Sequence, residues 1–71
     1  MFELEEIFES MGRAYIYLGE DEKAIEYFEK LKEINPYYDE IYEIIVLIYE
    51  EIGDIEKAKI YKSKIESVEN G

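Results

Sequence analysis

Residues 41–52 carry a dense run of apolar side chains and predict a helix that lies in a protein core. The longest unbroken apolar stretch in this run is six residues, far fewer than the roughly 20 that span a bilayer. Six residues alone fit either a strand or a helix. On a helix, however, the apolar side chains fall on one wide arc and three glutamates gather opposite, namely Glu43, Glu50 and Glu51. Leu47 breaks this pattern because it lies in the middle of the acidic side.

Apolar residues at spacings of three and four predict three further helices. The first covers residues 2–18, with a stripe formed by Leu4, Ile7, Phe8, Met11, Tyr15 and Leu18. The second covers residues 22–34, with Ala24, Ile25, Phe28, Leu31 and Ile34 on one side. The apolar run belongs to a third helix over residues 38–52. The fourth covers residues 55–68, with Ile55, Ala58, Tyr61, Ile65 and Val68 facing inward.

The ends of these helices carry the expected signals. Gly19 and Gly53 are predicted to stop the first and third helices, because glycine adopts the left-handed conformation that often follows a helix. Asp21 and Asp54 are predicted N-caps, since a carboxylate accepts hydrogen bonds from free backbone N–H groups. Pro36 is expected to end the second helix and to begin the next segment.

Shifting the chain by 34 residues aligns it with itself without a gap. The matching pairs include Glu6 with Glu40, Ile7 with Ile41, Glu9 with Glu43, Tyr15 with Tyr49, Gly19 with Gly53, Ala24 with Ala58 and Tyr27 with Tyr61. A period of 34 built from two helices and a short turn is the signature of the tetratricopeptide repeat.

The chain resembles the tetratricopeptide repeat family at that family's characteristic positions. These are Phe8, Met11, Gly12, Tyr15, Gly19, Ala24, Phe28 and Pro36 in the first unit, and Tyr42, Ile45, Tyr49, Gly53 and Ala58 in the second. In the second unit Val46 replaces a small residue, Lys62 an aromatic one and Asn70 the proline. The resemblance implies an all-α fold of two helix-turn-helix hairpins, with four antiparallel helices in a segment of an α-solenoid. The single domain is residues 1–71, with repeats at about 5–38 and 39–71.

The departures from the family pattern have physical consequences. Gly12 facing Ala24 predicts a close approach of the first two helices, whereas Val46 predicts a wider spacing in the second unit. Lys62 places a charge where a following repeat would pack, which suits a terminal unit. Two units are fewer than the three usually needed for stability, so we expect a partner to supply the missing packing.

By the same resemblance, the first helix of each hairpin lines a concave groove that binds peptides or a partner's helix. The expected binding residues are Glu9, Arg13, Ile16 and Tyr17 from the first helix and Glu43, Ile44, Leu47 and Glu51 from the third, with Glu6, Glu40 and Glu50 on the rim. Some family members hold a terminal carboxylate with lysines and asparagines here. Because Glu9 and Glu43 occupy those positions, carboxylate recognition is not expected.

Simpler interpretations of these residues stay open. Glutamates on exposed helix faces mainly interact with water, and single exposed hydrophobic residues such as Ile16 and Tyr17 need no special role. Arg13 pairs with Glu9 or Tyr17 at little gain in stability. The group of Leu47, Ile44 and Tyr17 is harder to explain without a contact surface. Tyr37 and Tyr38 are expected to pack between the two units.

Composition excludes several classes of function. The net charge of −11 argues against nucleic-acid binding and favours basic or apolar partners. The chain has no cysteine and no histidine, so disulfides, thiolate sites and the commonest general base are absent. No acidic loop has calcium-binding spacing, and we expect no cofactor, no metal and no enzymatic activity. The acidic amino terminus lacks the features of a signal peptide, which predicts a cytoplasmic protein without membrane attachment. The abundance of Glu, Lys, Ile and Tyr leans towards a heat-adapted, thermostable protein.

The sequence therefore predicts a non-catalytic module for protein–protein interaction. Because the Leu47 group and the two-unit deficit point the same way, we expect a homodimer formed through the concave face of the first and third helices. Two alternatives stay open at this point. One is a monomeric adaptor that binds a basic amphipathic peptide, and the other is a constructed repeat scaffold without a dedicated partner.

Overall fold

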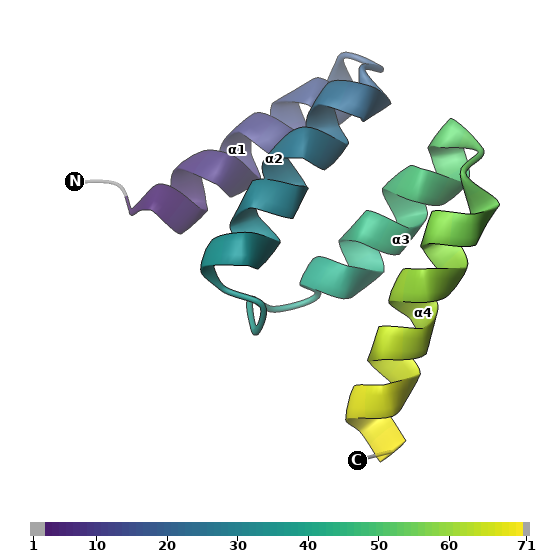
Figure 1. The fold of residues 1–71 in the computed structure, drawn as a ribbon. Helices are drawn as coiled ribbons and strands as arrows, with labels where there is room; N and C mark the ends of the chain where they lie inside the picture. Colours follow the sequence, from purple (N-terminus) through teal and green to yellow (C-terminus); the bar gives the residue numbers. More distant parts are fainter. Residues whose placement is uncertain (1–2, 71) are drawn as a thin grey trace.

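The chain forms four helices, which connect in sequence as two helical hairpins (Figure 1). The computed structural model describes residues 3–70, with side chains over residues 3–67. The helices are α1 (Leu4–Tyr17), α2 (Asp21–Ile34), α3 (Ile41–Ile52) and α4 (Ile55–Asn70), and no strand occurs within residues 3–70. The predicted all-α fold is confirmed.

Both glycine stops are confirmed, and they close the two hairpins in the same way. Gly19 has a φ of 76° and Gly53 a φ of 96°, the left-handed region that a side chain would disfavour. The backbone N–H of Glu20 then donates to the carbonyl of Tyr15, and that of Asp54 donates to the carbonyl of Tyr49, each at 2.9 Å. The tight hairpin turn is thus repeated at the 34-residue period.

The two aspartate caps have different outcomes. The N–H of Lys57 donates to Oδ1 of Asp54 at 3.2 Å, so the cap of α4 is confirmed. Asp21 is not a cap, because it is already the first residue of α2. Glu20 precedes that helix and makes no side-chain capping bond. The prediction was wrong by one residue since the chain leaves the glycine turn directly into the helix.

The third helix begins later than predicted, at Ile41 instead of Tyr38. Residues 35–40 form a turn between the hairpins, so Pro36 does not open a helix. Glu40 closes this turn with a φ of 61°, an uncommon conformation for a residue with a side chain. The first helix also begins later than predicted, at Leu4, because Glu3 has an extended backbone and precedes the helix. Phe2, its predicted first residue, lies outside the described residues.

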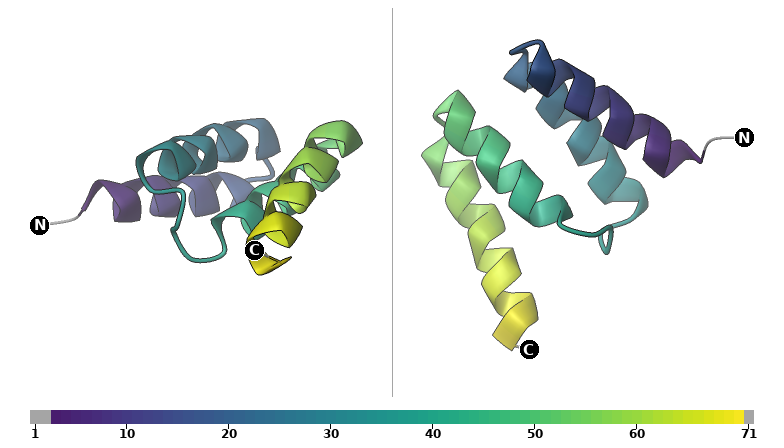
Figure 2. Two further views of the ribbon diagram at one scale, coloured as in Figure 1. Left: turned by 60° about the horizontal axis from the view of Figure 1, so that its bottom comes forward. Right: turned by 180° about the vertical axis from the view of Figure 1, so that it is seen from behind.

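The helices pack in chain order, α1 against α2, α2 against α3 and α3 against α4 (Figure 2). The core therefore follows the two middle helices and their neighbours. Its buried members are Ala24, Ile25, Phe28 and Leu31 of α2, Ile41, Ile45, Val46 and Ile48 of α3, and Ala58 and Tyr61 of α4. The apolar run of residues 41–52 is covered on most of its circumference, as predicted, and Leu47 stays exposed.

The predicted stripe of α1 is largely exposed, which corrects the sequence-based expectation. Of its members, Leu4, Ile7, Met11 and Leu18 are exposed, and only Phe8 and Tyr15 are half-buried against the core. The residue that α1 buries is Gly12. Similarly, Ile55 of α4 is exposed, and the side chain of Val68 lies outside the described residues.

Each hairpin contains the same aromatic contacts at equivalent positions. Tyr15 stacks on Tyr27 with ring centroids 5.7 Å apart, and Tyr49 stacks on Tyr61 at 5.9 Å. A lysine amine lies over the second ring of each pair at 5.1 Å, contributed by Lys30 and by Lys64. These repeated contacts show that the sequence repeat is also a structural one.

Polar contacts join one hairpin to the other. The hydroxyl of Tyr61 donates to Oε1 of Glu29 at 2.7 Å and accepts from Nζ of Lys32 at 3.1 Å. Burial alone would lower the pKa of Lys32, but the hydrogen bond to Tyr61 and the charge of Glu29 outweigh it and raise the pKa. Burial, together with the bond to Glu29, raises the pKa of Tyr61. The folded state therefore favours an uncharged tyrosine between a carboxylate and an ammonium group.

Candidate functional site

A hollow of about 250 Å³ opens between α1, α2 and α3. Its lining consists of Arg13 and Ile16 from α1, Asp21 and Phe28 from α2, and Ile44, Leu47, Ile48 and Glu51 from α3. The members are mainly apolar, with three charged side chains among them. The lining of the hollow therefore suits a ligand with an apolar group and charged groups beside it.

The bottom of the hollow belongs to the core, because Phe28 and Ile48 are buried. Its sides are accessible, since Ile16 is exposed and Leu47 is 62% exposed. Exposed apolar side chains such as Ile16 and Leu47 lower the free energy when a partner covers them and removes their surface from water. The arrangement favours binding of another apolar surface.

The structure brings together five of the eight residues predicted to bind a partner. Those that line the hollow are Arg13, Ile16, Ile44, Leu47 and Glu51. Tyr17 lies outside it and is 88% exposed. Glu43 lines a different hollow, of about 460 Å³, between the inter-hairpin turn and Ile65.

The eighth predicted residue, Glu9, is held by contacts within the chain. Its Oε1 lies 3.4 Å from Nε of Arg13, which confirms the expected pair, and its other oxygen accepts a hydrogen bond from the hydroxyl of Tyr38. The bond to Glu9, and then burial, raise the pKa of Tyr38 to about 12. Glu9 therefore orients Arg13 at the edge of the hollow and ties α1 to the turn.

Sequence reasoning missed three lining residues, Asp21, Phe28 and Ile48. Asp21 had been assigned to a cap, and the other two to the interior. The sequence held one signal for Phe28, namely the glycine at position 12. A Cβ added to Gly12 would meet the ring of Phe28 at 2.5 Å, so this phenylalanine fills the space that the glycine leaves. The expected approach of the helices at Gly12 is present, with the ring of Phe28 as the nearest group instead of Ala24.

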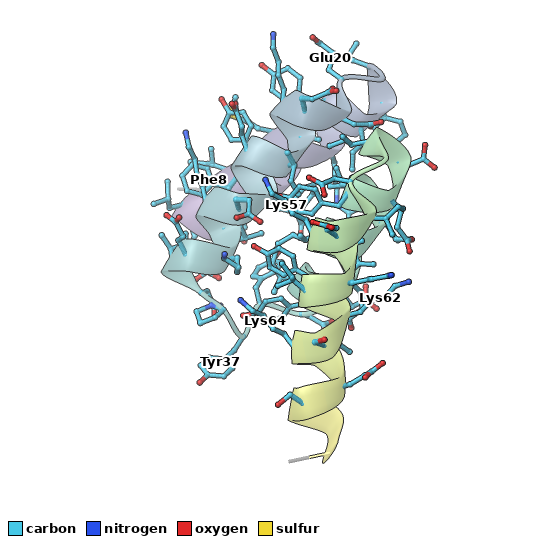
Figure 3. All side chains as sticks on the ribbon, turned by 45° about the vertical axis from the view of Figure 1, so that its right-hand side comes forward. Phe8, Glu20, Tyr37, Lys57, Lys62 and Lys64 are labelled. Carbon is cyan, nitrogen blue, oxygen red and sulfur yellow. The ribbon has the colours of Figure 1, made fainter. Side chains whose placement is uncertain are left out.

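The two tyrosines of the inter-hairpin turn behave differently. Tyr38 packs against the core, as expected. Tyr37 is 92% exposed and projects away from the turn (Figure 3), so the prediction that it packs between the units is wrong. The N–H of Tyr37 donates to Oδ1 of Asn35 at 3.0 Å, which fixes the backbone of the turn and leaves the ring in water.

The described residues offer little for chemistry. No group of three or more acidic side chains among them is placed to hold a metal ion. None of the helices described is long and apolar enough to cross a membrane.

A stack of antiparallel helical hairpins with a 34-residue period and an apolar hollow beside their first helices defines a helical repeat protein of the binding type. The sequence profile described as tetratricopeptide repeat matches residues 5–38 and 39–64. The chain therefore belongs to the tetratricopeptide repeat family, whose repeats mediate protein–protein interaction and form non-catalytic modules.

A curated relative supports this membership. The chain is 74% identical over 65 residues to a TPR repeat-containing protein of Methanocaldococcus jannaschii, and the match covers 92% of the chain. It covers 20% of the relative, so the chain spans about a fifth of that protein's length. No solved structure matches the chain.

Proposed function

We propose that this protein is a non-catalytic interaction module that binds a second copy of itself through the hollow between α1, α2 and α3. The observation that carries the proposal is the position of Leu47, which is 62% exposed and lines an apolar hollow together with Ile16 and Ile44. Arg13 and Glu51 line the same hollow with opposite charges, which suits self-complementary pairing.

The energetic reason is the small core. Two hairpins bury few residues for a chain of 71, and domains of this size are marginally stable without further packing. Full burial of a leucine is worth roughly 1.5–3 kcal/mol. A dimer that covers Leu47, Ile16 and Ile44 on both copies would build an eight-helix core. Glu9, Tyr17 and Glu43 would surround this contact.

The molecular mass in solution, measured by light scattering over a concentration series, tests the proposal. We expect a dimer in the micromolar range, and Leu47→Glu should dissociate it by burying a charge. Ile60→Glu is the matched control, because Ile60 is 56% exposed on α4 and lies outside the hollow. A monomer at high micromolar concentration would refute self-association.

A second candidate is a monomeric adaptor that accepts a basic amphipathic helix in the same hollow. The observation in its favour is the charge of the lining, where Asp21 and Glu51 outnumber Arg13, on a chain with a net charge of −11. It predicts binding of a cationic amphipathic peptide that weakens as salt increases. Unfolding midpoints would then be independent of protein concentration, whereas those of a dimer rise with it.

A further inference from the structure

The exposed face of α1 and α3 beside the hollow carries different chemistry at equivalent positions of the repeat. Under the 34-residue shift Arg13 falls on Leu47, and Tyr17 falls on Glu51. α1 thus presents a cation and, about one turn later, an aromatic ring, whereas α3 presents an aliphatic group and then a carboxylate. All four side chains are exposed. At this face the two helices are complementary to each other instead of alike.

The charges at this face are not joined within one chain. Arg13 and Glu51 line the same hollow, yet no ion pair among the described residues includes Glu51. Arg13 pairs with Glu9 through Nε at 3.4 Å. Its guanidinium group has two further nitrogens, which can bind a second carboxylate. Each chain therefore offers both partners of an ion pair that it does not form itself.

The direction of the helices fixes how two copies could join these groups. α1 and α3 run in the same direction, since each opens a hairpin (Figure 1). A two-fold axis perpendicular to them therefore sets α1 of one copy antiparallel to α3 of the other. In an antiparallel pair, a step forward along one helix is a step back along the other. When Arg13 lies opposite Glu51, Tyr17 consequently lies opposite Leu47.

We propose that the dimer is two-fold symmetric and pairs α1 of each copy with α3 of the other. Arg13 binds Glu51 of the partner subunit, and the ring of Tyr17 covers the partner's Leu47. This inference rests on the proposed self-association and adds its geometry and the residues that decide it. The apolar contact removes the most exposed leucine of the hollow from water, and the ion pair selects the register. Symmetry forms each contact twice.

The charge of α3 argues against the other symmetric arrangement, in which like helices face each other. Glu43, Glu50 and Glu51 gather on the side of α3 that also carries Leu47. Two copies of α3 face to face would bring these carboxylates together, and like charges across an interface are destabilising. Opposite α1, by contrast, Glu51 meets an arginine.

A charge exchange tests the pairing. Arg13→Glu and Glu51→Arg, each alone, should weaken the dimer at least about tenfold, because each places like charges opposite each other twice. In an equimolar mixture of the two variants, one chain has carboxylates at both positions and the other has guanidinium groups at both. Both contacts are then attractive, so we expect a dimer of one chain of each kind with an affinity within about threefold of the native value. Light scattering over a concentration series measures the affinity, and native mass spectrometry identifies the mixed dimer.

Two substitutions on α4 are matched controls. Glu66→Arg and Lys59→Glu change the net charge by the same amounts at exposed positions outside the hollow, and they should leave the dimer unchanged. Circular dichroism at a concentration too low for dimerisation checks that every variant keeps its helices.

The apolar contact has a test of its own, a double-mutant cycle on the dimer affinity. Tyr17→Ala and Leu47→Ala should each weaken the dimer. If the two side chains touch across the interface, the double variant should weaken it by clearly less than the product of the single effects, since each substitution removes the same contact. Independent effects would contradict the assigned register.

The two possible failures are distinguishable. A native chain that stays monomeric at high micromolar concentration refutes the proposed function, and the inference fails with it. A native dimer whose single variants dimerise as well as the native chain, or whose mixed variants stay monomeric, overturns the pairing of α1 with α3 and leaves self-association standing.

Discussion

α1 and α3 have nearly the same pattern of apolar residues and opposite fates. Ile45 is 0% exposed, while its equivalent Met11 is 37% exposed; Ile41 and Ile7 differ in the same way. The local sequence is not the cause, because both helices place these residues on one line. The difference is the neighbour, since α3 has α2 on one side and α4 on the other, whereas α1 has α2 alone. A helical repeat buries a residue only where another repeat stands beside it.

Truncation of the matched pair is the strongest test of this comparison. Ile45→Ala should destabilise the protein by about 2–5 kcal/mol, because it removes buried methyl groups and leaves a cavity. Met11→Ala should cost less than about 1 kcal/mol, since the side chain is already in contact with water. Urea unfolding of both variants at one protein concentration measures the difference. Equal losses would mean that the stripe of α1 is covered in solution.

The close contact inside each hairpin also differs between the two. In the first, Gly12 leaves room for the ring of Phe28; in the second, Val46 stands at the glycine position and Lys62 at the phenylalanine position. In the second hairpin the larger Val46 on α3 therefore goes with Lys62 on α4, which has no ring to place against it.

Gly12→Ala should therefore destabilise the first hairpin. The added methyl group would lie 2.5 Å from the Phe28 ring, and overpacking of a core costs about 1–3 kcal/mol. Alanine recovers up to about 1 kcal/mol through its higher helix propensity, so a net loss of up to about 2 kcal/mol is expected. Combining it with Phe28→Leu makes room and should reduce the penalty. A stabilised single variant would show that the ring moves freely.

Much of the fold follows from the sequence, because the repeat and the glycine stops are local signals. Gly19, Gly53 and Asp54 act as predicted, and so does the Arg13–Glu9 pair. The exposure of the α1 stripe was not predictable from periodicity, because periodicity shows that one face of a helix is apolar and does not show what covers that face. The residues predicted to bind a partner all came from the first helix of each hairpin. The prediction therefore missed Phe28, which lies at the buried bottom of the hollow and belongs to α2.

The hydroxyl groups of the equivalent tyrosines give a finer test. Tyr61→Phe removes bonds to the charged side chains of Glu29 and Lys32 and should cost about 1 kcal/mol. Tyr27→Phe removes a hydroxyl without such a bond in the described structure and should cost less than about 0.5 kcal/mol. Both substitutions keep the ring stacking, so chemical unfolding isolates the polar part. A larger cost at Tyr27 would reveal a partner for its hydroxyl.

The last test concerns the turn that separates the hairpins, where the contribution of Tyr38 to stability changes in alkali. The pKa of Tyr38 is raised to about 12 in the folded protein, mainly by its hydrogen bond to Glu9, against about 10 in an unfolded chain. The folded state therefore favours the protonated tyrosine. Its contribution to stability is complete below pH about 10 and is lost as the pH rises from about 10 to about 12.

Tyr38→Phe should accordingly make stability less sensitive to alkali. The variant loses the bond to Glu9 and is somewhat less stable at neutral pH, but it has no phenol to ionise at this position. The pKa values of Tyr49, Tyr61 and Lys32 are also raised, and these groups titrate in both proteins. Their effects cancel when the free energies of unfolding of the two proteins are compared at neutral pH and at pH about 11. The difference in free energy of unfolding between the native protein and Tyr38→Phe should become smaller as the pH rises. A constant difference would show that Glu9 does not hold the Tyr38 proton.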